Sequence, residues 1–388
     1  MNRVELKPGV YSVGAVDWNI RSFHGYSANR GVTYNAYLII DEKITLIDAV
    51  KDVFADELLA RISDIVDPAR IDYIVSNHVE MDHSGALPAV VKAAPNATIV
   101  TSSPNGFKGL QAHYGSDFKF LPVKAGDTLS LGKRTLQFVG TPMLHWPDNM
   151  VTYCPEEKIL FSNDAFGQHY CTSKRFDDEV DLNIAIFEAQ KYYANILMPY
   201  GAQARKALAI VKELDMDMIA PSHGIIWRSH IDDILKQYEY YSNDEPDDVA
   251  IVVYDSMWHS TEKMAFSIAE GFARKGLTVK YYDLKVNEMS DIMAEVLKAK
   301  YIAVGSSTLN NQMLPNVAAF LCYLKGLAPK NKKAFAFGSY GWGGQGVPYV
   351  NDELKACGLE IVLDPIKLLY IPTPEQLVEL ENTIANIE

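Results

Sequence analysis

The residues best suited to chemistry lie close together between Asn77 and Pro88. This stretch, Asn-His-Val-Glu-Met-Asp-His-Ser-Gly-Ala-Leu-Pro, follows the apolar run 71–75, which we expect to be a buried strand. It holds four potential metal ligands: His78, Glu80, Asp82 and His83. In an extended segment alternate side chains point the same way, and a turn after the third ligand can bring the fourth to that side. A polar loop facing water is the alternative for any one of these residues. Because metal sites are recognised by clustered ligands, we expect a metal centre here.

The pattern His-x-Glu-x-Asp-His resembles the metal motif of the metallo-β-lactamase fold. Hydrolases of that fold carry a histidine where this chain has Glu80, and a carboxylate at this position is similar to that of the flavodiiron proteins, which reduce oxygen and nitric oxide. A carboxylate contributes negative charge and a hard oxygen ligand, which suits iron that cycles between ferrous and ferric states better than it suits zinc. The resemblance therefore implies a pair of non-haem iron ions.

Three later segments resemble the remaining ligand loops of the same family. Thr-Pro-Met-Leu-His-Trp-Pro-Asp carries His145, Ser-Asn-Asp carries Asp164 after an expected hairpin, and Ala-Pro-Ser-His-Gly-Ile-Ile-Trp carries His223. The resemblance implies one iron bound by His78, Glu80 and His145, and a second bound by Asp82, His83 and His223. Asp164 would bridge them, because the two oxygens of a carboxylate can bind two metals. In some family members water separates the histidine at the position of His83 from the iron.

Three further side chains are candidates for positions beside the metals and for catalytic proton transfer: His24, His169 and Tyr193. His24 lies on an expected loop between two strands, where a plain surface position is the alternative. His169 follows Asp164 closely and could be another ligand, but we favour a role in giving or receiving protons. Of the neighbouring Tyr192 and Tyr193, the second resembles the pocket tyrosine of the family. Ordinary core packing is the alternative for each tyrosine.

After residue 248, short β-rich runs alternate with helical patterns, which predicts a doubly wound parallel sheet of flavodoxin type. Ligands of such sheets bind at the loops outside the carboxyl ends of the strands. Three polar loops follow expected strands, over 255–262, 305–311 and 338–344. The first offers hydroxyl and backbone N–H groups at a helix N-terminus, which can hold a phosphate. The other two resemble the ring-binding loops of flavodoxins.

These loops predict a site for the mononucleotide FMN. A dinucleotide site would need Gly-x-Gly-x-x-Gly after the first strand, and 256–261 contains no glycine. A flavodoxin-like module without a ligand is the other alternative. The candidate FMN contacts are Ser256, Met257, Trp258, His259, Ser260, Thr261, Ser307, Thr308, Asn310, Asn311, Ser339, Tyr340, Gly341, Trp342, Gly343 and Gly344.

The chain is expected to be an α/β protein of two domains, joined at the acidic, proline-containing segment 242–248. The first, 1–247, would be a metallo-β-lactamase-like αββα sandwich with the diiron site. The second, 248–388, would be the flavodoxin-like domain with FMN. Within the first domain, alternating apolar and polar residues predict strands over 9–18 and 33–40, and helical periodicity predicts a helix over 84–94.

Composition limits the possible partners of the 388-residue chain. Apolar residues make up 48% and charged residues 22%, which favours a folded protein over a disordered one. The net charge of −13 argues against nucleic acid or an anionic membrane as a partner, since both need a positive surface. The four cysteines form no Cys-x-x-Cys pair, and neither a signal core nor a membrane span is evident. We therefore expect a cytoplasmic protein with reduced thiols.

The function implied by the resemblance is reduction of oxygen to water, of nitric oxide to nitrous oxide, or of both, with FMN passing electrons to the diiron site. No rubredoxin-type cysteine pairs occur before the end at Glu388, so we expect a separate electron donor, either rubredoxin or a reduced flavin or deazaflavin cofactor. The family resemblance implies a homodimer, or a dimer of such dimers. The main alternative is a dizinc hydrolase of the metallo-β-lactamase or glyoxalase kind fused to a flavodoxin domain. A pure electron-carrier or binding protein would leave the seven ligands unexplained.

Overall fold

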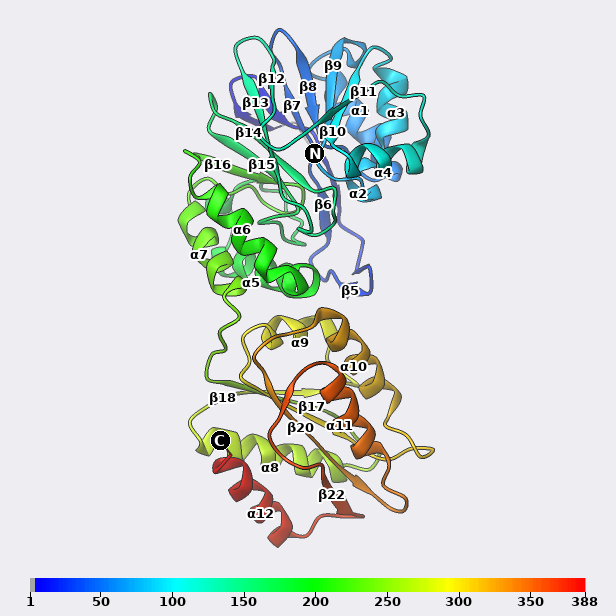
Figure 1. Cartoon of the computed structure of the whole chain (residues 1–388), viewed down its shortest axis with the longest axis vertical. Helices are drawn as coiled ribbons and strands as arrows, with labels where there is room; N and C mark the ends of the chain where they lie inside the picture. Colours follow the sequence, from blue (N-terminus) through cyan, green and yellow to red (C-terminus); the bar gives the residue numbers. More distant parts are fainter. Residues whose placement is uncertain (1–3, 388) are drawn as a thin grey trace. The chain divides into compact units, whose positions relative to one another are not determined.

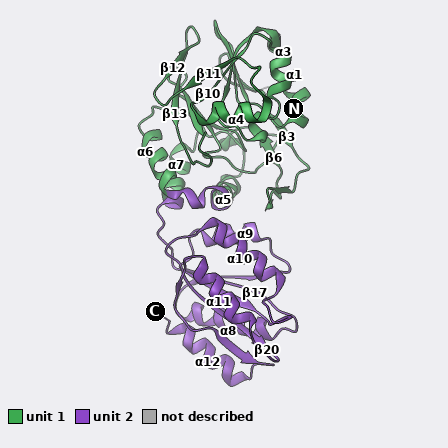
Figure 2. Ribbon diagram, turned by 45° about the vertical axis from the view of Figure 1, so that its right-hand side comes forward, with its two compact units in different colours: residues 1–192, 202–239 green, residues 193–201, 240–388 purple. Residues whose placement is uncertain are grey.

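The computed structural model describes residues 4–387. The chain divides into two compact units, a first unit of residues 1–192 and 202–239 and a second unit of residues 193–201 and 240–388 (Figure 2). The division predicted after residue 247 stays a prediction. Residues 1–3 and 388, at the outer ends of the two predicted domains, lie outside the described residues.

The first unit is built on two β-sheets (Figure 1). The seven-stranded sheet has the order β1-β2-β7-β8-β9-β10-β11, with β1 (Val4–Lys7), β2 (Val10–Ser12), β7 (Tyr37–Ile39), β8 (Ile44–Ile47), β9 (Ile71–Ser76), β10 (Thr98–Ser102) and β11 (Phe120–Val123). The five-stranded sheet has the order β12-β13-β14-β15-β16, with β12 (Thr128–Ser130), β13 (Thr135–Gly140), β14 (Met150–Cys154), β15 (Ile159–Asn163) and β16 (Met218–Pro221). Two short pairs complete the strands: β3 (Ala15–Asp17) with β6 (Val32–Tyr34), and β4 (Ser22–Phe23) with β5 (Tyr26–Ser27).

Strand β9, inside the seven-stranded sheet, packs apolar side chains on both faces. Because side chains alternate along a strand, Val75 of β9 packs against the five-stranded sheet, where it joins Phe138 and Phe161 in one core cluster. Its neighbour Ile74 points to the other face and packs in a second cluster with Leu58 of the first helix. Two buried faces explain the continuous apolar run at 71–75. The arrangement confirms the metallo-β-lactamase-like sandwich predicted for this part of the chain.

Helices flank these sheets. They are α1 (Ala55–Ser63), α2 (Met81–Ser84), α3 (Leu87–Ala93), α4 (Asn105–Tyr114), α5 (Leu182–Tyr192), α6 (Gly201–Val211) and α7 (Ile231–Ser242). Short 3₁₀ turns of the first unit are η1 (Asp52–Phe54), η2 (Pro68–Arg70) and η3 (Asp177–Glu179). The π-helical turn η4 (Tyr193–Leu197), which follows α5 directly in the chain, and the 3₁₀ turn η5 (Met198–Tyr200) belong to the second unit. Within residues 4–387, no helix has the length and apolar character needed to cross a lipid bilayer.

The second unit contains a parallel sheet of order β18-β17-β19-β20-β21, with β22 also paired to β20. Its strands are β17 (Val249–Asp255), β18 (Thr278–Asp283), β19 (Tyr301–Ser306), β20 (Lys333–Tyr340), β21 (Glu360–Ile361) and β22 (Ile366–Leu369). Its helices are α8 (Ser260–Arg274), α9 (Met289–Val296), α10 (Pro315–Leu327), α11 (Gly346–Ala356) and α12 (Pro374–Ala385). The order in which the second strand lies outside the first is that of flavodoxins, so the predicted fold class is confirmed.

Several predicted elements are divided in the structure. The strand expected over 9–18 breaks into β2 and β3 at Gly14, where an added Cβ would lie 2.2 Å from the carbonyl oxygen of Tyr34. This close backbone approach is open only to glycine. The helix expected over 84–94 is two helices, α2 and α3, and α2 begins before it. These breaks matter because α2 carries metal-ligand candidates.

Candidate metal centre and cofactor pocket

All seven predicted metal ligands come together in the first unit. Strands β13, β15 and β16 run in one direction, since β14 is antiparallel to both of its neighbours and β15 is parallel to β16. Their carboxyl ends therefore share one edge of the sheet, and His145, Asp164 and His223 lie on the loops that leave it. The other four ligands follow β9 of the facing sheet: His78, Glu80, Asp82 and His83.

The first group of ligands consists of His78, Glu80 and His145. Oε2 of Glu80 lies 3.3 Å from Nε2 of His78 and 3.2 Å from Nε2 of His145. These three atoms converge on one point, as ligands of a single ion do.

The second group consists of Asp82, His83 and His223. Oδ2 of Asp82 lies 3.4 Å from Nε2 of His83 and 3.2 Å from Nε2 of His223. Asp82 was expected on an extended segment with His83 following a turn, but both lie on α2, which begins at Met81. The helical turn carries both side chains into the buried interior, where neither is more than 4% exposed.

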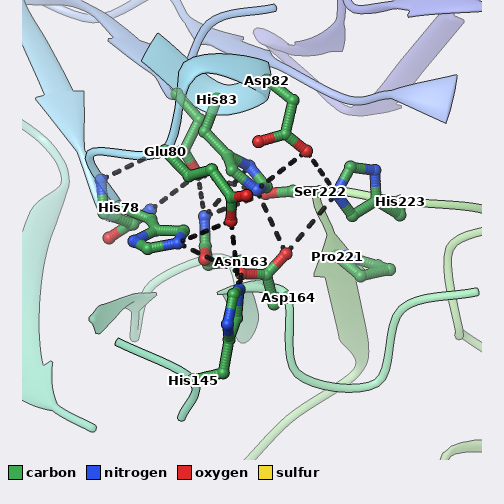
Figure 3. A network of polar contacts seen from close by, with 12 residues as sticks. His78, Glu80, Asp82, His83, His145, Asn163, Asp164, Pro221, Ser222 and His223 are labelled. Atoms are coloured by element: carbon green, nitrogen blue, oxygen red, sulfur yellow. Dashed lines mark hydrogen bonds and ion pairs between the residues drawn. The ribbon is translucent and has the colours of Figure 1, made fainter. Parts of the chain in front are cut away.

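Asp164 lies between the two groups (Figure 3). Its Oδ2 is 3.5 Å from Nε2 of His145 and 3.8 Å from Nε2 of His78, on the side of the first group. Its Oδ1 is 3.1 Å from Nε2 of His83 and 3.4 Å from Nε2 of His223, on the side of the second. One carboxylate thus offers one oxygen to each group, which is the geometry of a bridging ligand.

Three buried atoms of the ligand side chains support metal binding. Asp82 Oδ1, His83 Nε2 and Asp164 Oδ2 make no well-directed hydrogen bond among residues 4–387, although His83 Nε2 lies 3.1 Å from Asp164 Oδ1. Buried polar atoms are nearly always paired in native proteins, so such a concentration at one place indicates a missing ligand. The mixture of imidazole nitrogen and carboxylate oxygen suits iron, and the residues present therefore fit a diiron site.

The pKa shifts in the cluster of seven ligands also fit a metal site. Burial alone would lower the pKa of His223, but hydrogen bonds to Asp164 and Asp82 raise it to about 10. Burial would raise the pKa of Glu80, and hydrogen bonds from His145 and His78 outweigh it and hold the pKa below its ordinary value. The carboxylates and histidines thus stabilise each other's charges, and a metal ion would replace the protons on the imidazoles.

Hydrogen bonds behind the ligands orient the histidine rings. Nδ1 of His78 is 2.8 Å from Oδ2 of Asp148, and Nδ1 of His223 is 2.7 Å from the backbone oxygen of Thr33. Each contact directs Nε2 toward the cluster. Asp148 closes the predicted ligand segment 141–148, but its role was not predicted. Gly224 follows His223 with a φ of 83°, and a Cβ there would lie 1.9 Å from Oε1 of Gln168, so this tight turn requires glycine.

Two of the predicted neighbours of the ligands also lie at the cluster. Nε2 of His24 is 2.9 Å from Oε1 of Glu80, and the His24 side chain is 67% exposed. His169 is fully buried, stacks on Tyr26 at 4.7 Å between ring centroids, and lies 5.5 Å from the His223 ring. Neither ring nitrogen of His169 has a hydrogen-bond partner among residues 4–387. Burial and then the charge of His223 lower the pKa of His169 well below its ordinary value, so its imidazole is neutral.

The two adjacent tyrosines differ in their contacts. The hydroxyl of Tyr192 donates to Oδ1 of Asp164 at 2.8 Å. Tyr193, which the sequence favoured, begins the π-helical turn η4 and packs against the ring of Tyr241 at 5.4 Å. The structure therefore brings Tyr192 to the bridging carboxylate in place of Tyr193.

The second unit contains a cavity of about 580 Å³ at the carboxyl ends of its strands. This lies within the range of about 300–1,000 Å³ that is typical of small-molecule sites. Eleven of the predicted FMN contacts line it: Met257, Trp258, Ser260, Ser307, Thr308, Asn310, Asn311, Ser339, Tyr340, Gly341 and Trp342. Tyr370 and Ile371, which follow β22, also line it and were not predicted.

The five other predicted contacts do not line this cavity: Ser256, His259, Thr261, Gly343 and Gly344. Thr261 instead ties the three loops together, with Oγ1 at 2.9 Å from Oγ of Ser307 and 3.3 Å from Oγ of Ser339. Oγ of Ser256 is buried without a hydrogen-bond partner among residues 4–387, as a donor that awaits a phosphate oxygen would be. Nδ1 of His259 is 2.5 Å from Oε2 of Glu262. The loops therefore fit FMN, although not every predicted contact reaches the cavity.

Comparison with known proteins agrees with the fold of both units. Residues 32–224 match the family model described as ODP family beta lactamase, and residues 252–383 match the flavodoxin model. The chain is 46% identical to a nitric oxide reductase of Moorella thermoacetica, over 96% of this chain and 95% of the relative. It is 43% identical to the rubredoxin-oxygen oxidoreductase of Megalodesulfovibrio gigas, over 99% of this chain and 98% of the relative. The crystal structure of the flavodiiron protein from Giardia intestinalis superposes with a TM-score of 0.96 at 38% identity, covering 100% of this chain and 96% of that one.

Proposed function

This chain belongs to the flavodiiron protein family, and from this premise we propose which of its residues carry out the reaction. As a member it is an oxidoreductase that reduces oxygen or nitric oxide, with FMN and a non-haem diiron site as cofactors. We assign His78, Glu80 and His145 to one iron, Asp82, His83 and His223 to the other, and Asp164 to the bridge. When bound, the irons and FMN supply the electrons for reducing the gas.

The observation that carries this assignment is the position of Asp164, with one oxygen facing each ligand group. Together with Glu80 and Asp82 it gives three carboxylates at the site. Their negative charge offsets most of the charge of two divalent ions, so the metals can lie in a buried place without a large uncompensated charge. The dizinc hydrolase alternative is not favoured, because Glu80 occupies the position where such hydrolases carry a histidine.

We assign proton transfer to His24 and His169, and orientation of the bridging carboxylate to Tyr192. His24 contacts Glu80 and is largely exposed, so its imidazole can exchange protons between solvent and the first ligand group. Neutral His169 offers one donor and one acceptor nitrogen beside His223. The Tyr192 hydroxyl donates a hydrogen bond to Oδ1 of Asp164 and so orients this carboxylate. Since reduction of either gas consumes protons as well as electrons, groups that carry protons to the buried centre are needed.

The experiment for this assignment combines metal analysis with gas consumption. Purified protein loaded with iron and FMN is supplied with reduced rubredoxin, and the uptake of oxygen and of nitric oxide is followed separately under anaerobic handling. We expect two irons and one FMN per chain and consumption of at least one gas. Two zinc ions with hydrolysis of thioesters or lactams would contradict the assignment and support the hydrolase.

We further infer that a separate rubredoxin, or a reduced flavin or deazaflavin cofactor, delivers electrons to FMN. The relative from Megalodesulfovibrio gigas is a rubredoxin-oxygen oxidoreductase, which supports rubredoxin as the donor. A cytoplasmic location is supported by the four free cysteines: Cys154, Cys171, Cys322 and Cys357. The rate of flavin reduction by each donor in a stopped-flow instrument would distinguish the donors.

We also propose a head-to-tail homodimer, or a dimer of such dimers, that places the FMN of one subunit against the diiron site of its partner. Large exposed side chains border the flavin cavity, where Trp258 is 86% and Trp342 is 81% exposed. Beside the metal ligands, Met81 is 54% and Trp146 is 37% exposed. Exposed apolar side chains at both sites are what a contact between copies would cover.

The dimer is tested by complementation. One variant lacks the ligands His78 and His145, and a second carries bulky residues at Ser260 and Thr261, so neither chain alone has both cofactor sites. In a head-to-tail mixed dimer, one junction joins an intact FMN to an intact diiron site, and gas reduction returns. Mixed dimers that form but consume no gas would rule out electron transfer between subunits.

A further inference from the structure

The three loops that carry His78, Asp164 and His223 share a feature that the reaction does not explain. In each, the residue immediately before the ligand is polar and completely buried: Asn77, Asn163 and Ser222. Asn77 directly follows β9, Asn163 is the last residue of β15, and Ser222 directly follows β16. Strand β9 belongs to one sheet, and β15 and β16 belong to the other. Burial of three polar side chains costs free energy unless they are hydrogen-bonded. The partner that they share therefore indicates their structural role.

That partner is Asp48, which lies just after β8 and is 2% exposed. Its Oδ1 accepts from the backbone N–H of Asn77 at 2.8 Å. Its Oδ2 accepts from Nδ2 of Asn77 at 3.0 Å, from Nδ2 of Asn163 at 3.4 Å and from Oγ of Ser222 at 3.4 Å. One carboxylate thus contacts the residue before a ligand in three separate loops.

The network extends to the remaining ligand segments. Oδ1 of Asn163 accepts from Nδ2 of Asn149 at 3.1 Å, and Oδ1 of Asn149 accepts from the backbone N–H of Trp146, next to His145, at 2.6 Å. On the main chain, the N–H of Ala49 donates to the carbonyl of His83 at 2.9 Å. Every loop that bears a ligand is therefore connected to Asp48 or to its neighbour in sequence.

The chemistry of the network requires a carboxylate at this position. The backbone N–H of Trp146 can only donate, which sets the orientation of the Asn149 amide and, through it, that of Asn163. Nδ2 of Asn163 and the backbone N–H of Asn77 are therefore donors to Asp48, and the Asn77 amide and the Ser222 hydroxyl are placed to donate as well. Only a carboxylate accepts on both of its oxygens. An asparagine would direct its NH₂ group at a donor in either orientation. Asp48 also has a φ of 56°, a conformation that aspartate tolerates better than most residues do.

We propose that Asp48 is a positioning residue that holds the ligand loops of the two sheets in register for the diiron site. The inference rests on the proposed ligand assignment. The hydrogen bonds of the Asp48 carboxylate go to residues next to the ligands and not to the ligand side chains. It acts through Asn77, Asn163 and Ser222. Partners of this kind, one layer behind the ligands, typically change metal affinity about 10- to 100-fold when they are replaced.

The test compares Asp48→Asn with Asp177→Asn in the full chain loaded with iron and FMN. Asp177 is a matched control, because it is 1% exposed and accepts from backbone N–H groups of residues 228–230, away from the ligands. The measurements are iron per chain, the rate of iron loss to a chelator, the Mössbauer spectrum of the bound iron, FMN content, and the thermal midpoint of the metal-free protein.

We expect Asp48→Asn to lose iron at least about 10-fold faster than the wild type and to show an altered Mössbauer spectrum. FMN content should be unchanged, and the thermal midpoint should fall no further than in Asp177→Asn. Iron loss and spectra equal to those of the control would overturn the proposal while leaving the ligand assignment intact. A wild-type protein that binds no iron would overturn both.

A second variant covers the case in which Asp48→Asn does not fold. Ser222→Ala removes one hydroxyl and one bond to Asp48, with little change in volume. We expect iron loss to be about threefold faster in this variant, with a normal thermal midpoint. Iron loss at the wild-type rate would contradict the role of the network.

Discussion

The hydroxyl of Tyr192 lies 2.8 Å from Oδ1 of Asp164, the oxygen of the bridging carboxylate that faces His83 and His223. Tyr192 is fully buried, and burial followed by the charge of Asp164 raises the pKa of its phenol well above the ordinary value. The phenol therefore keeps its proton at any physiological pH and donates a hydrogen bond to the carboxylate. This hydrogen bond restrains the orientation of Asp164.

Removing that hydroxyl should impair the enzyme. A hydrogen bond to a charged group contributes about 1.5–3 kcal/mol, so we expect Tyr192→Phe to lower the rate of gas reduction about tenfold or more. Tyr193→Phe is the matched control, because it removes the same atom from the adjacent residue and should change the rate less than about threefold. Rates are measured per diiron site in protein with full FMN content. A larger loss of rate in Tyr193→Phe than in Tyr192→Phe would instead assign this role to Tyr193, the residue that the sequence favoured.

Glu80 should determine which metal the site takes up. Glu80→His restores the ligand set of the related hydrolases, and we expect the protein to bind zinc in place of iron and to stop reducing gas. Glu80→Asp keeps the carboxylate and serves as control, with iron retained at lower affinity because the shorter side chain reaches less far. Metal analysis after growth in medium containing both metals gives the answer. Unchanged iron content and activity in Glu80→His would show that the Glu80 carboxylate does not select iron over zinc.

Thr261 should affect FMN binding without touching the cavity. Its Oγ1 bonds to the hydroxyls of Ser307 and Ser339 and accepts from the backbone N–H of Ser339 at 3.2 Å, so it links the loops after β17, β19 and β20. Thr261→Val preserves the shape and leaves these groups without a partner. We expect the Kd for FMN to rise about tenfold, measured by flavin fluorescence, with iron content unchanged. Thr278→Val on the exposed start of β18 is the control, and equal affinities in the two variants would contradict the role of Thr261.

The grouping of the seven proposed metal ligands could be predicted because each follows a strand and stands in a local pattern. The pocket tyrosine could not be chosen in the same way. Adjacent residues on a helix point about 100° apart, and the chain passes from α5 into the π-helical turn between Tyr192 and Tyr193, which alters the rotation further. Which of the two faces Asp164 therefore depends on how the helix packs, and the local sequence does not contain that information.

Asp48 and Tyr370 were missed for a related reason. Asp48 is 29 residues from Asn77 and 174 residues from Ser222 in the sequence. Apolar strands often end at an aspartate, so Asp48 did not stand out. Tyr370 follows β22, a strand of only four residues, partly buried or exposed, which is too short to stand out in the sequence. Contacts that join distant segments through a single polar side chain leave no periodicity in the sequence. The doubly wound order of the sheet, in contrast, followed from the repeated alternation of strand and helix.

A buried lysine in the second unit should make its stability depend on pH. The ammonium group of Lys332 is 4% exposed and donates to the backbone oxygen of Leu297 at 3.0 Å. Burial, followed by the charge of Lys298, lowers its pKa from 10.5 to about 8. Between pH 8 and 10 the unfolded chain keeps this proton while the folded protein releases it. Because the unfolded state then binds more protons, the free energy of unfolding rises with pH over this range, and below pH 8 the burial cost is fully present.

Replacing the lysine should remove that cost. The pKa difference corresponds to about 3 kcal/mol, and the lost hydrogen bond offsets about 1 kcal/mol, so we expect Lys332→Met to raise the free energy of unfolding by about 2 kcal/mol at pH 7. The advantage should disappear as the pH approaches 10, where folded wild-type protein carries a neutral amine. Lys330→Met, at an exposed position two residues earlier, is the control and should leave the pH dependence as in the wild type. Urea unfolding followed by FMN release at pH 7 and pH 9.5 measures both values. A difference between Lys332→Met and wild type that stays constant over this range would show that the buried amine does not titrate there.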